Sequence, residues 1–182
     1  SGMGMPAIGI YSHELFHFYD VDNIIRVGSA GTITDKLHLR DVVLGQAACT
    51  DSNYAHQFGL GGTLAPVANY ELLETAVNVA RKSGASWVVG SFFSSDIFYN
   101  KANDSLKWAD YGVVAVEMES AALFVVAAAL GCRCGSCFHV VWNQEREKAG
   151  LDQTMSEDTT ASVKVAVEAL KLLIQQDRAA RG

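Results

Sequence analysis

Residues 113–131 read VVAVEMESAALFVVAAALG, and this stretch decides the fold class. Its first four residues are apolar and mostly β-branched, which predicts a short buried strand. Residues 120–130 are a continuous run of small and apolar residues closed by Gly131, which predicts a buried helix. A strand that leads directly into a helix is the unit from which mainly parallel sheets are built. Two carboxylates, Glu117 and Glu119, lie at the junction.

The same alternation continues on both sides of this stretch. Further strands are expected at residues 23–27, 41–48, 86–93 and 134–142, and further helices at residues 8–19, 70–83 and 159–176. We therefore expect one α/β domain over residues 1–182, with a mixed, largely parallel central sheet flanked by helices. The glycine-rich residues 1–6 lead into a helix with no strand before it, so we expect an N-terminally truncated fold that lacks its first strands.

The composition limits the classes of partner. Hydrophobic residues make up 49% of the 182 residues and the net charge is −6, which suits a globular protein and disfavours binding to nucleic acid or an anionic membrane. An anionic substrate would then need a local positive site. No apolar run is long enough to span a bilayer, and no cleavable signal is visible. Three of the four cysteines cluster in the apolar residues 132–137, which favours a buried strand of a reduced, cytoplasmic protein over a zinc site.

The two carboxylates at the strand–helix junction suggest a site, because a buried charge is costly unless it is paired. Glu117 and Glu119 could perform acid/base chemistry of the glycosidase type. Alternatively, one of them could accept hydrogen bonds from vicinal hydroxyls of a sugar. The preference of helix N-termini for acidic residues would explain one glutamate but not both.

Arg26 is a candidate ligand of an anion. It is expected at the end of the strand 23–27, and the small residues Gly28, Ser29 and Gly31 follow it. Ligands of open α/β sheets bind outside the carboxyl ends of the strands, where a guanidinium beside a hydroxyl and bare amides could clamp a phosphate. Pairing of Arg26 with a nearby carboxylate is an equally good interpretation.

Two further motifs allow a functional and a structural interpretation. Residues 94–99, SSDIFY, follow an expected strand; the aromatic rings could stack on a planar ligand and Asp96 could orient a catalytic group, or the segment could be a turn. Residues 13–17, HELFH, match the His-Glu-x-x-His of zinc peptidases. Because no third histidine follows at the expected spacing, a surface or interface helix explains this motif better, and we expect no metal.

In chain order, six segments resemble the purine nucleoside phosphorylases of the bacterial hexameric type. These segments are Gly2-Met3-Gly4, Arg26-Val27-Gly28-Ser29 with Gly31, Leu39-Arg40-Asp41-Val42-Val43, Ala48-Cys49-Thr50-Asp51-Ser52, Ser95-Asp96-Ile97-Phe98-Tyr99 and Val116-Glu117-Met118-Glu119-Ser120. That family converts a nucleoside and inorganic phosphate reversibly into a free base and ribose 1-phosphate. The resemblance implies the same activity, phosphate as co-substrate, no prosthetic group, and a homo-oligomer, either a dimer or a hexamer.

The resemblance also implies roles for individual residues. Arg26, Gly28 and Ser29 would bind phosphate; Met3, Met118 and Glu119 would bind the ribose, with Glu119 accepting both hydroxyls; Phe98, Val116, Glu117 and Asn143 would face the base; and Asn143 and Asp96 would be the catalytic pair.

Asn143 departs from the pattern of the adenine-accepting members, which place there an aspartate that protonates N7 of the base. An asparagine can hydrogen-bond a purine but cannot release a proton. From Val140 onward the chain resembles the uridine phosphorylases, whose uracil-reading insertion is nevertheless absent between Tyr99 and Tyr111. Glu145 or Arg146 could contribute to the base pocket.

The expected function is therefore a purine nucleoside phosphorylase, with a uridine or broad-specificity phosphorylase as the alternative. The strand and Pro-Gly-Asp-Pro loop that complete the family's phosphate site would lie upstream of Ser1. A third hypothesis follows from this: an inactive homologue that binds nucleosides or forms oligomers.

Overall fold

The computed structural model describes residues 2–100, 104–144 and 158–181. Its elements are α1 (Met5–Phe18), β1 (Asn23–Thr32), β2 (Val42–Thr50), the short helix η1 (Tyr54–Phe58), α2 (Tyr70–Ser83), β3 (Trp87–Ser94), the short helix η2 (Asp104–Tyr111), β4 (Val113–Glu117), α3 (Ser120–Leu130), β5 (Arg133–Asn143) and α5 (Thr160–Arg181). The α/β class is confirmed. The helices predicted at residues 70–83 and 120–130 match at both ends.

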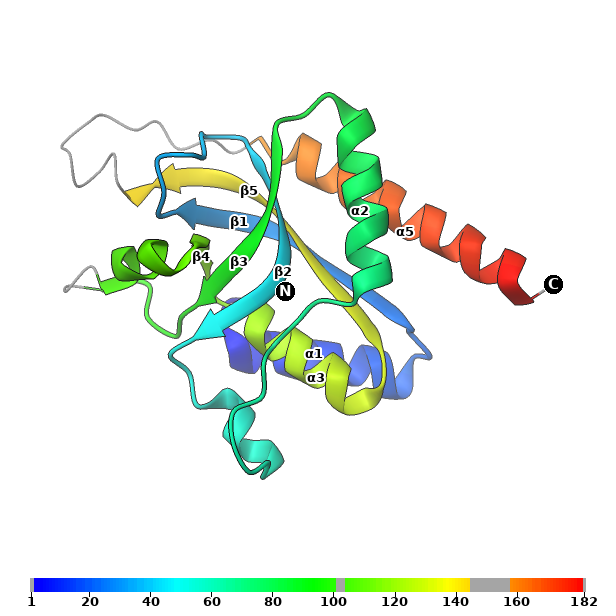
Figure 1. The fold of residues 1–182 in the computed structure, drawn as a ribbon. Coiled ribbons are helices and arrows are strands. Elements are labelled where there is room, and N and C mark those ends of the chain that lie inside the picture. The colour runs from blue at the N-terminus through cyan, green and yellow to red at the C-terminus, as the bar shows by residue number, and fades with distance from the viewer. Residues whose placement is uncertain (1, 101–103, 145–157, 182) are drawn as a thin grey trace.

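The strands form one mixed sheet. β1 pairs with β5, β2 with β3, and β3 with β4 in parallel, whereas the β1–β4 and β2–β5 ladders are antiparallel. In the part of the chain that the structure describes, these ladders close into a barrel in the order β1-β4-β3-β2-β5 (Figure 1). Closure pairs each of these strands on both sides, which removes the open edges of an ordinary sheet.

The end of β1 differs from the sequence prediction. The strand was expected to stop at Val27, but it continues to Thr32 because residues 28–32 pair with residues 138–143 of β5. Glycine is required for this pairing at Gly31, where a Cβ would lie 2.7 Å from the Trp142 ring. Arg26 consequently lies inside a strand rather than in a crevice at its end, and that expectation was wrong.

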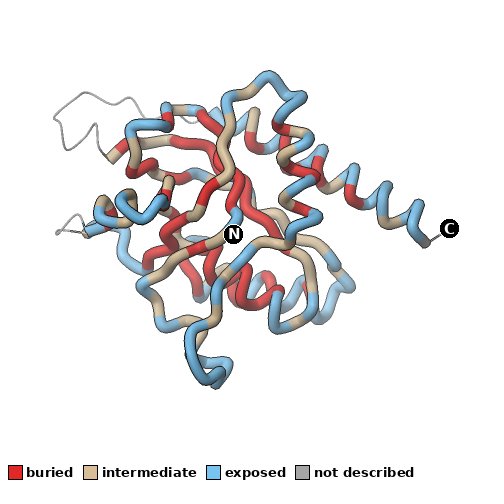
Figure 2. Tube along the Cα trace, in the orientation of Figure 1, coloured by how far each residue is buried: buried red, intermediate tan, exposed pale blue. Residues whose placement is uncertain are grey.

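The helices pack in two pairs on the barrel. α1 lies beside α3 and α2 lies beside α5 (Figure 1). α3 is the most buried of them, since residues 120–127 are all buried, whereas α1 and α5 expose much of their surface (Figure 2). The strands and α3 therefore supply most of the core. Among the described helices, none combines the length and the apolarity needed to cross a membrane.

Candidate functional site

The carboxylate of Glu119 is the centre of the candidate site. Glu119 is the residue immediately before α3, and it is only 4% exposed. Its Oε1 accepts a hydrogen bond of 2.8 Å from the backbone N–H of Gly4, and its Oε2 accepts from Arg26 Nη2 and, at 3.3 Å, from the N–H of Met118. Three chain segments, at α1, β1 and α3, thus converge on one carboxylate.

The guanidinium of Arg26 is largely buried as well, with 18% of its side chain exposed. It lies across Gly28, and its Cζ is 4.6 Å from the centroid of the Phe138 ring, a cation–π distance. Its Nη1 is buried and has no hydrogen-bond partner among the described residues. A buried donor left unpaired costs about 1–3 kcal/mol, so this nitrogen is available to donate to a ligand anion.

Glu117 caps the start of α3 with its carboxylate. Its Oε2 accepts hydrogen bonds of 2.8 Å from the N–H groups of Glu119 and Ser120, and its Oε1 accepts from the hydroxyl of Ser94. The same hydroxyl accepts from the N–H of Ala121 at 3.0 Å. Burial raises the pKa of Glu117 above its usual value, and the hydrogen bonds and the charge of Arg26 oppose that shift. The prediction that this residue faces the base stays a prediction.

The residues predicted to bind the sugar are brought together by backbone contacts. Gly4, which donates to Glu119, has a φ of +87°, a conformation that favours glycine. Met3 precedes it and is 79% exposed, while Met118 precedes Glu119 and is half-buried. The glycine-rich loop therefore directs a backbone amide toward the protein's own carboxylate, that of Glu119.

Two of the residues predicted to face the base lie at neighbouring strand ends. Val116 of β4 pairs with Gly31 of β1, which pairs in turn with Trp142 of β5, the residue before Asn143. Asn143 is buried, and its Nδ2 donates to the carbonyl of Leu37 at 3.3 Å. The ends of β4, β1 and β5 thus place Val116 and Asn143 on adjacent parts of the barrel.

The loop after β3 makes its described contacts with other residues than Arg26 and Glu119. Ser95 Oγ donates to Asp51 at 2.9 Å, and the N–H of Asp96 donates to the same carboxylate at 3.3 Å. Asp96 is exposed, and Phe98 is 71% exposed with its ring edge-on to Tyr99. Within residues 2–100 and 104–144, no hydrogen bond, ion pair or ring contact joins Asp96 or Phe98 to Arg26 or Glu119.

Ser29 is exposed on β1, opposite His139 in the β1–β5 ladder. Glu145 and Arg146, considered for the base pocket, lie outside the described residues.

Comparison with known proteins decides the family. The sequence model of the Phosphorylase superfamily matches residues 1–176. The chain belongs to the phosphorylase superfamily. A protein of Geobacillus kaustophilus (strain HTA426) named purine nucleoside phosphorylase DeoD-type is 40% identical over 173 residues, which cover 93% of this chain and 72% of that protein. A protein of the same name from Listeria welshimeri serovar 6b is 42% identical over 172 residues, with the same coverage of each chain.

This phosphorylase superfamily chain carries two residues at the site that sequence reasoning missed. Ser94 was noticed only as the start of the segment 94–99, although a serine at the buried end of a strand is a signal for a hydrogen bond to the next element. Phe138 supplies the ring under Arg26. Its role depends on the β1–β5 register, for which the sequence carries no local signal.

The structure also places the residues of the two motifs that suggested a metal. The rings of His13 and His17 stack on α1 with centroids 5.4 Å apart. Cys134 and Cys137 are buried in β5, and burial raises the pKa of each thiol to about 12. Across residues 2–100, 104–144 and 158–181, no group of three or more histidine, cysteine or acidic side chains is placed to hold a metal ion.

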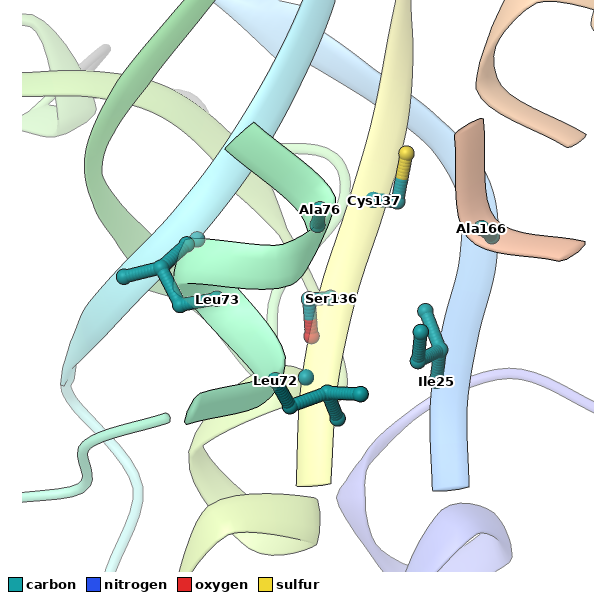
Figure 3. Close-up of a pocket in the computed structure, with 9 residues that line it drawn as sticks. Ile25, Leu72, Leu73, Ala76, Ser136, Cys137 and Ala166 are labelled. Carbon is teal, nitrogen blue, oxygen red and sulfur yellow. The ribbon is translucent and has the colours of Figure 1, made fainter. Parts of the chain in front are cut away.

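Two cavities in the described part of the chain lie away from the carboxylate centre. A void of about 10 Å³ lies between Leu72 of α2, Ile25 of β1, Cys137 of β5 and Ala166 of α5 (Figure 3). It has room for about one water molecule. A surface depression of about 320 Å³ is lined by Asp22, Arg133 and Asp177, and Arg133 is paired with Asp177. Neither Arg26 nor Glu119 lines either of these two cavities.

Proposed function

We propose that this chain is a purine nucleoside phosphorylase, which transfers the ribosyl or deoxyribosyl group of a purine nucleoside to inorganic phosphate. The observation that carries the proposal is the buried pair of Arg26 and Glu119 at the head of α3. A guanidinium suits phosphate, and a carboxylate suits vicinal sugar hydroxyls. The purine class is supported by the names of the relatives from Geobacillus and Listeria.

Phosphate would bind along β1. Nη1 of Arg26 is the buried donor without a protein partner, and the hydroxyl of Ser29 lies three residues further along the strand. Gly28 lets the guanidinium lie flat against the backbone. Phosphate held there against the sugar would attack C1′ as the bond from C1′ to the base breaks. It would also stabilise the positive charge that develops on the sugar.

The sugar would bind at Glu119. Its two carboxylate oxygens would accept hydrogen bonds from the 2′- and 3′-hydroxyls, with Met3 and Met118 against the apolar face of the ring. In the structure these oxygens are occupied by Arg26, Gly4 and Met118. Ligand binding would therefore break the ion pair. Arg26 would then bind phosphate, and Glu119 would bind the sugar hydroxyls.

The base would lie toward the ends of β4 and β5. Val116 and Phe98 would contact its rings, Glu117 would lie near it, and Asn143 would donate to the leaving base. The electrons of the broken bond go to the base, and a 6-oxopurine can carry that charge on O6. An amide donor is therefore sufficient for a 6-oxopurine, whereas adenine depends more on protonation at N7. Asp96 would orient the leaving group from the loop after β3.

A cytoplasmic homo-oligomer completes the proposal. Ile10, Phe18 and Tyr19, on or next to α1, are each more than half exposed. Large apolar side chains that are exposed in a single chain are often covered by a partner. The four cysteines are unpaired, which fits a reducing compartment.

The direct test is phosphate-dependent release of free base. Inosine, 2′-deoxyinosine, adenosine and uridine are each incubated with the protein, with and without phosphate, and the released base is measured by chromatography. Hypoxanthine should appear only with phosphate, and Arg26→Ala or Glu119→Ala should abolish its release. Release of uracil alone, or no release from any nucleoside, would overturn the proposal.

A further inference from the structure

We propose that Ser94 and Glu117 are positioning residues that orient Glu119 toward both ribose hydroxyls and thereby set the preference for ribonucleosides over 2′-deoxyribonucleosides. This inference rests on the proposed function and assigns Glu117 a role other than contact with the base.

The start of α3 is capped in an unusual way. The first N–H groups of a helix lack partners within it, and the residue at the N-cap normally accepts one of them with its side chain. Glu119 is at this position, yet its side chain makes no capping hydrogen bond. Glu117 instead accepts from the amides of residues 119 and 120, and Ser94 accepts from the amide of residue 121. The carboxylate of Glu119 is therefore released from capping and turns toward Arg26.

The capping residues also fix Glu119 itself. Glu117 binds the backbone N–H of Glu119 at 2.8 Å, so the two carboxylates are joined through the main chain. Ser94 extends the network to the end of β3, where its strand neighbour in the ladder is Glu117. Ser94, Glu117 and Glu119 are each less than 6% exposed. A network that is both buried and satisfied is rigid, because breaking any bond leaves an unpaired group.

Orientation of Glu119 affects the two sugars unequally. A ribose offers the 2′- and 3′-hydroxyls, and each carboxylate oxygen must meet one of them. A 2′-deoxyribose offers the 3′-hydroxyl alone, which the carboxylate can follow through a rotation. A displacement of Glu119 should therefore reduce turnover of ribonucleosides more than turnover of deoxyribonucleosides. Displacements near 1 Å cost about 10²-fold in well-positioned sites.

The test compares Glu117→Ala, Ser94→Ala and Glu117→Gln with the unchanged protein. Glu117→Ala and Ser94→Ala should lower kcat/KM for inosine by roughly 10- to 100-fold, in proportion to the displacement. The decrease in kcat/KM for 2′-deoxyinosine in these two variants should be several-fold smaller. Glu117→Gln should restore the ratio of the two substrates, since its amide oxygen accepts both N–H groups and its NH₂ can donate to Ser94.

Thr75→Ala is the matched control. Thr75 is a buried hydroxyl residue of α2 that donates to the carbonyl of Glu71, in a helix that packs beside α5. This variant should lower the Tm without changing the ratio of kcat/KM for inosine to that for 2′-deoxyinosine. If Ser94→Ala and Glu117→Ala behave like Thr75→Ala, Ser94 and Glu117 are merely structural and the inference is refuted.

The inference and the proposed function fail in different ways. If no nucleoside is turned over, the proposed function fails, and calorimetric Kd values for inosine and 2′-deoxyinosine then decide the inference. A Kd ratio that shifts in Ser94→Ala and returns in Glu117→Gln supports positioning. An unchanged ratio, or no binding of either nucleoside, refutes it.

Discussion

Replacing Gly28 by alanine tests the placement of Arg26 with a single methyl group. A Cβ at Gly28 would lie 2.5 Å from Nη1 of Arg26, 3.2 Å from its Cζ and 3.3 Å from the Phe138 ring. Carbon and nitrogen atoms pack at about 3.5 Å, so the guanidinium must move by roughly 1 Å. A displacement of that size costs about 10²-fold in rate, equivalent to about 2.7 kcal/mol of transition-state stabilisation.

Folding should tolerate the same substitution. The crowded atom is the end of a flexible side chain, and Gly28 is not among the glycines with a positive φ. Alanine in a strand interior is favoured over glycine by about 0.5–1 kcal/mol, which offsets part of the crowding. The variant should therefore lose activity while its Tm stays within a few degrees of that of the unchanged protein.

The assay measures initial rates of hypoxanthine release at saturating inosine and varied phosphate. Gly28→Ala should raise the KM for phosphate and lower kcat/KM for phosphate about 10²-fold. Gly61→Ala is the matched control, since a Cβ at Gly61 meets nothing within 4 Å and the φ there is not positive. If a folded Gly28→Ala protein binds phosphate as Gly61→Ala does, Arg26 is not the phosphate ligand.

Three further predictions concern the base, the pH dependence of stability and the thiols. Asn143→Asp should raise the ratio of adenosine to inosine turnover about tenfold or more, because an acid can protonate N7. Rates of base release measured by chromatography test this, and an unchanged ratio excludes Asn143 from the base site. Burial lowers the pKa of His139 from 6.5, so the unfolded chain binds more protons below that pH. The free energy of unfolding should therefore fall as the pH drops below 6.5, and urea titrations should show a weaker fall for His139→Gln. Cys134 and Cys137, with pKa values of about 12, should resist a thiol reagent at pH 8 until the protein is unfolded, as mass spectrometry of the labelled peptides would show.

Local signals in the sequence were sufficient for the regular elements. Residues 70–83 and 120–130 could be delimited because each helix ends at a glycine, Gly84 or Gly131, in the left-handed conformation. The end of β1 could not be predicted in this way. Glycines often interrupt a strand, but those of β1 leave room for the side chains of Trp142 and Phe138 on the neighbouring strand. That fit depends on register between residues more than a hundred positions apart.

Arg26 and Glu119 could be named as candidates from the sequence, but the contact between them could not be predicted. Of the two interpretations considered for Arg26, pairing with a carboxylate is observed, and phosphate binding stays a prediction. The different roles of Glu117 and Glu119 could be assigned only from the structure. A pattern of residues cannot tell that Glu117 caps α3 while Glu119 faces the guanidinium.

The convergence of α1, β1 and α3 on Glu119 has a consequence for the order of folding. Gly4 and Glu119 are 115 residues apart in sequence, and Arg26 and Glu119 are 93 apart. Bringing such distant segments together carries a large loop-closure entropy, and contacts of this kind form late. β2, α2, β3 and β4 lie between Arg26 and Glu119 in the chain, so this ion pair closes a loop that contains all four elements. Recovery of enzyme activity during refolding should thus lag behind recovery of helical circular dichroism, making turnover a reporter of the last step of barrel assembly.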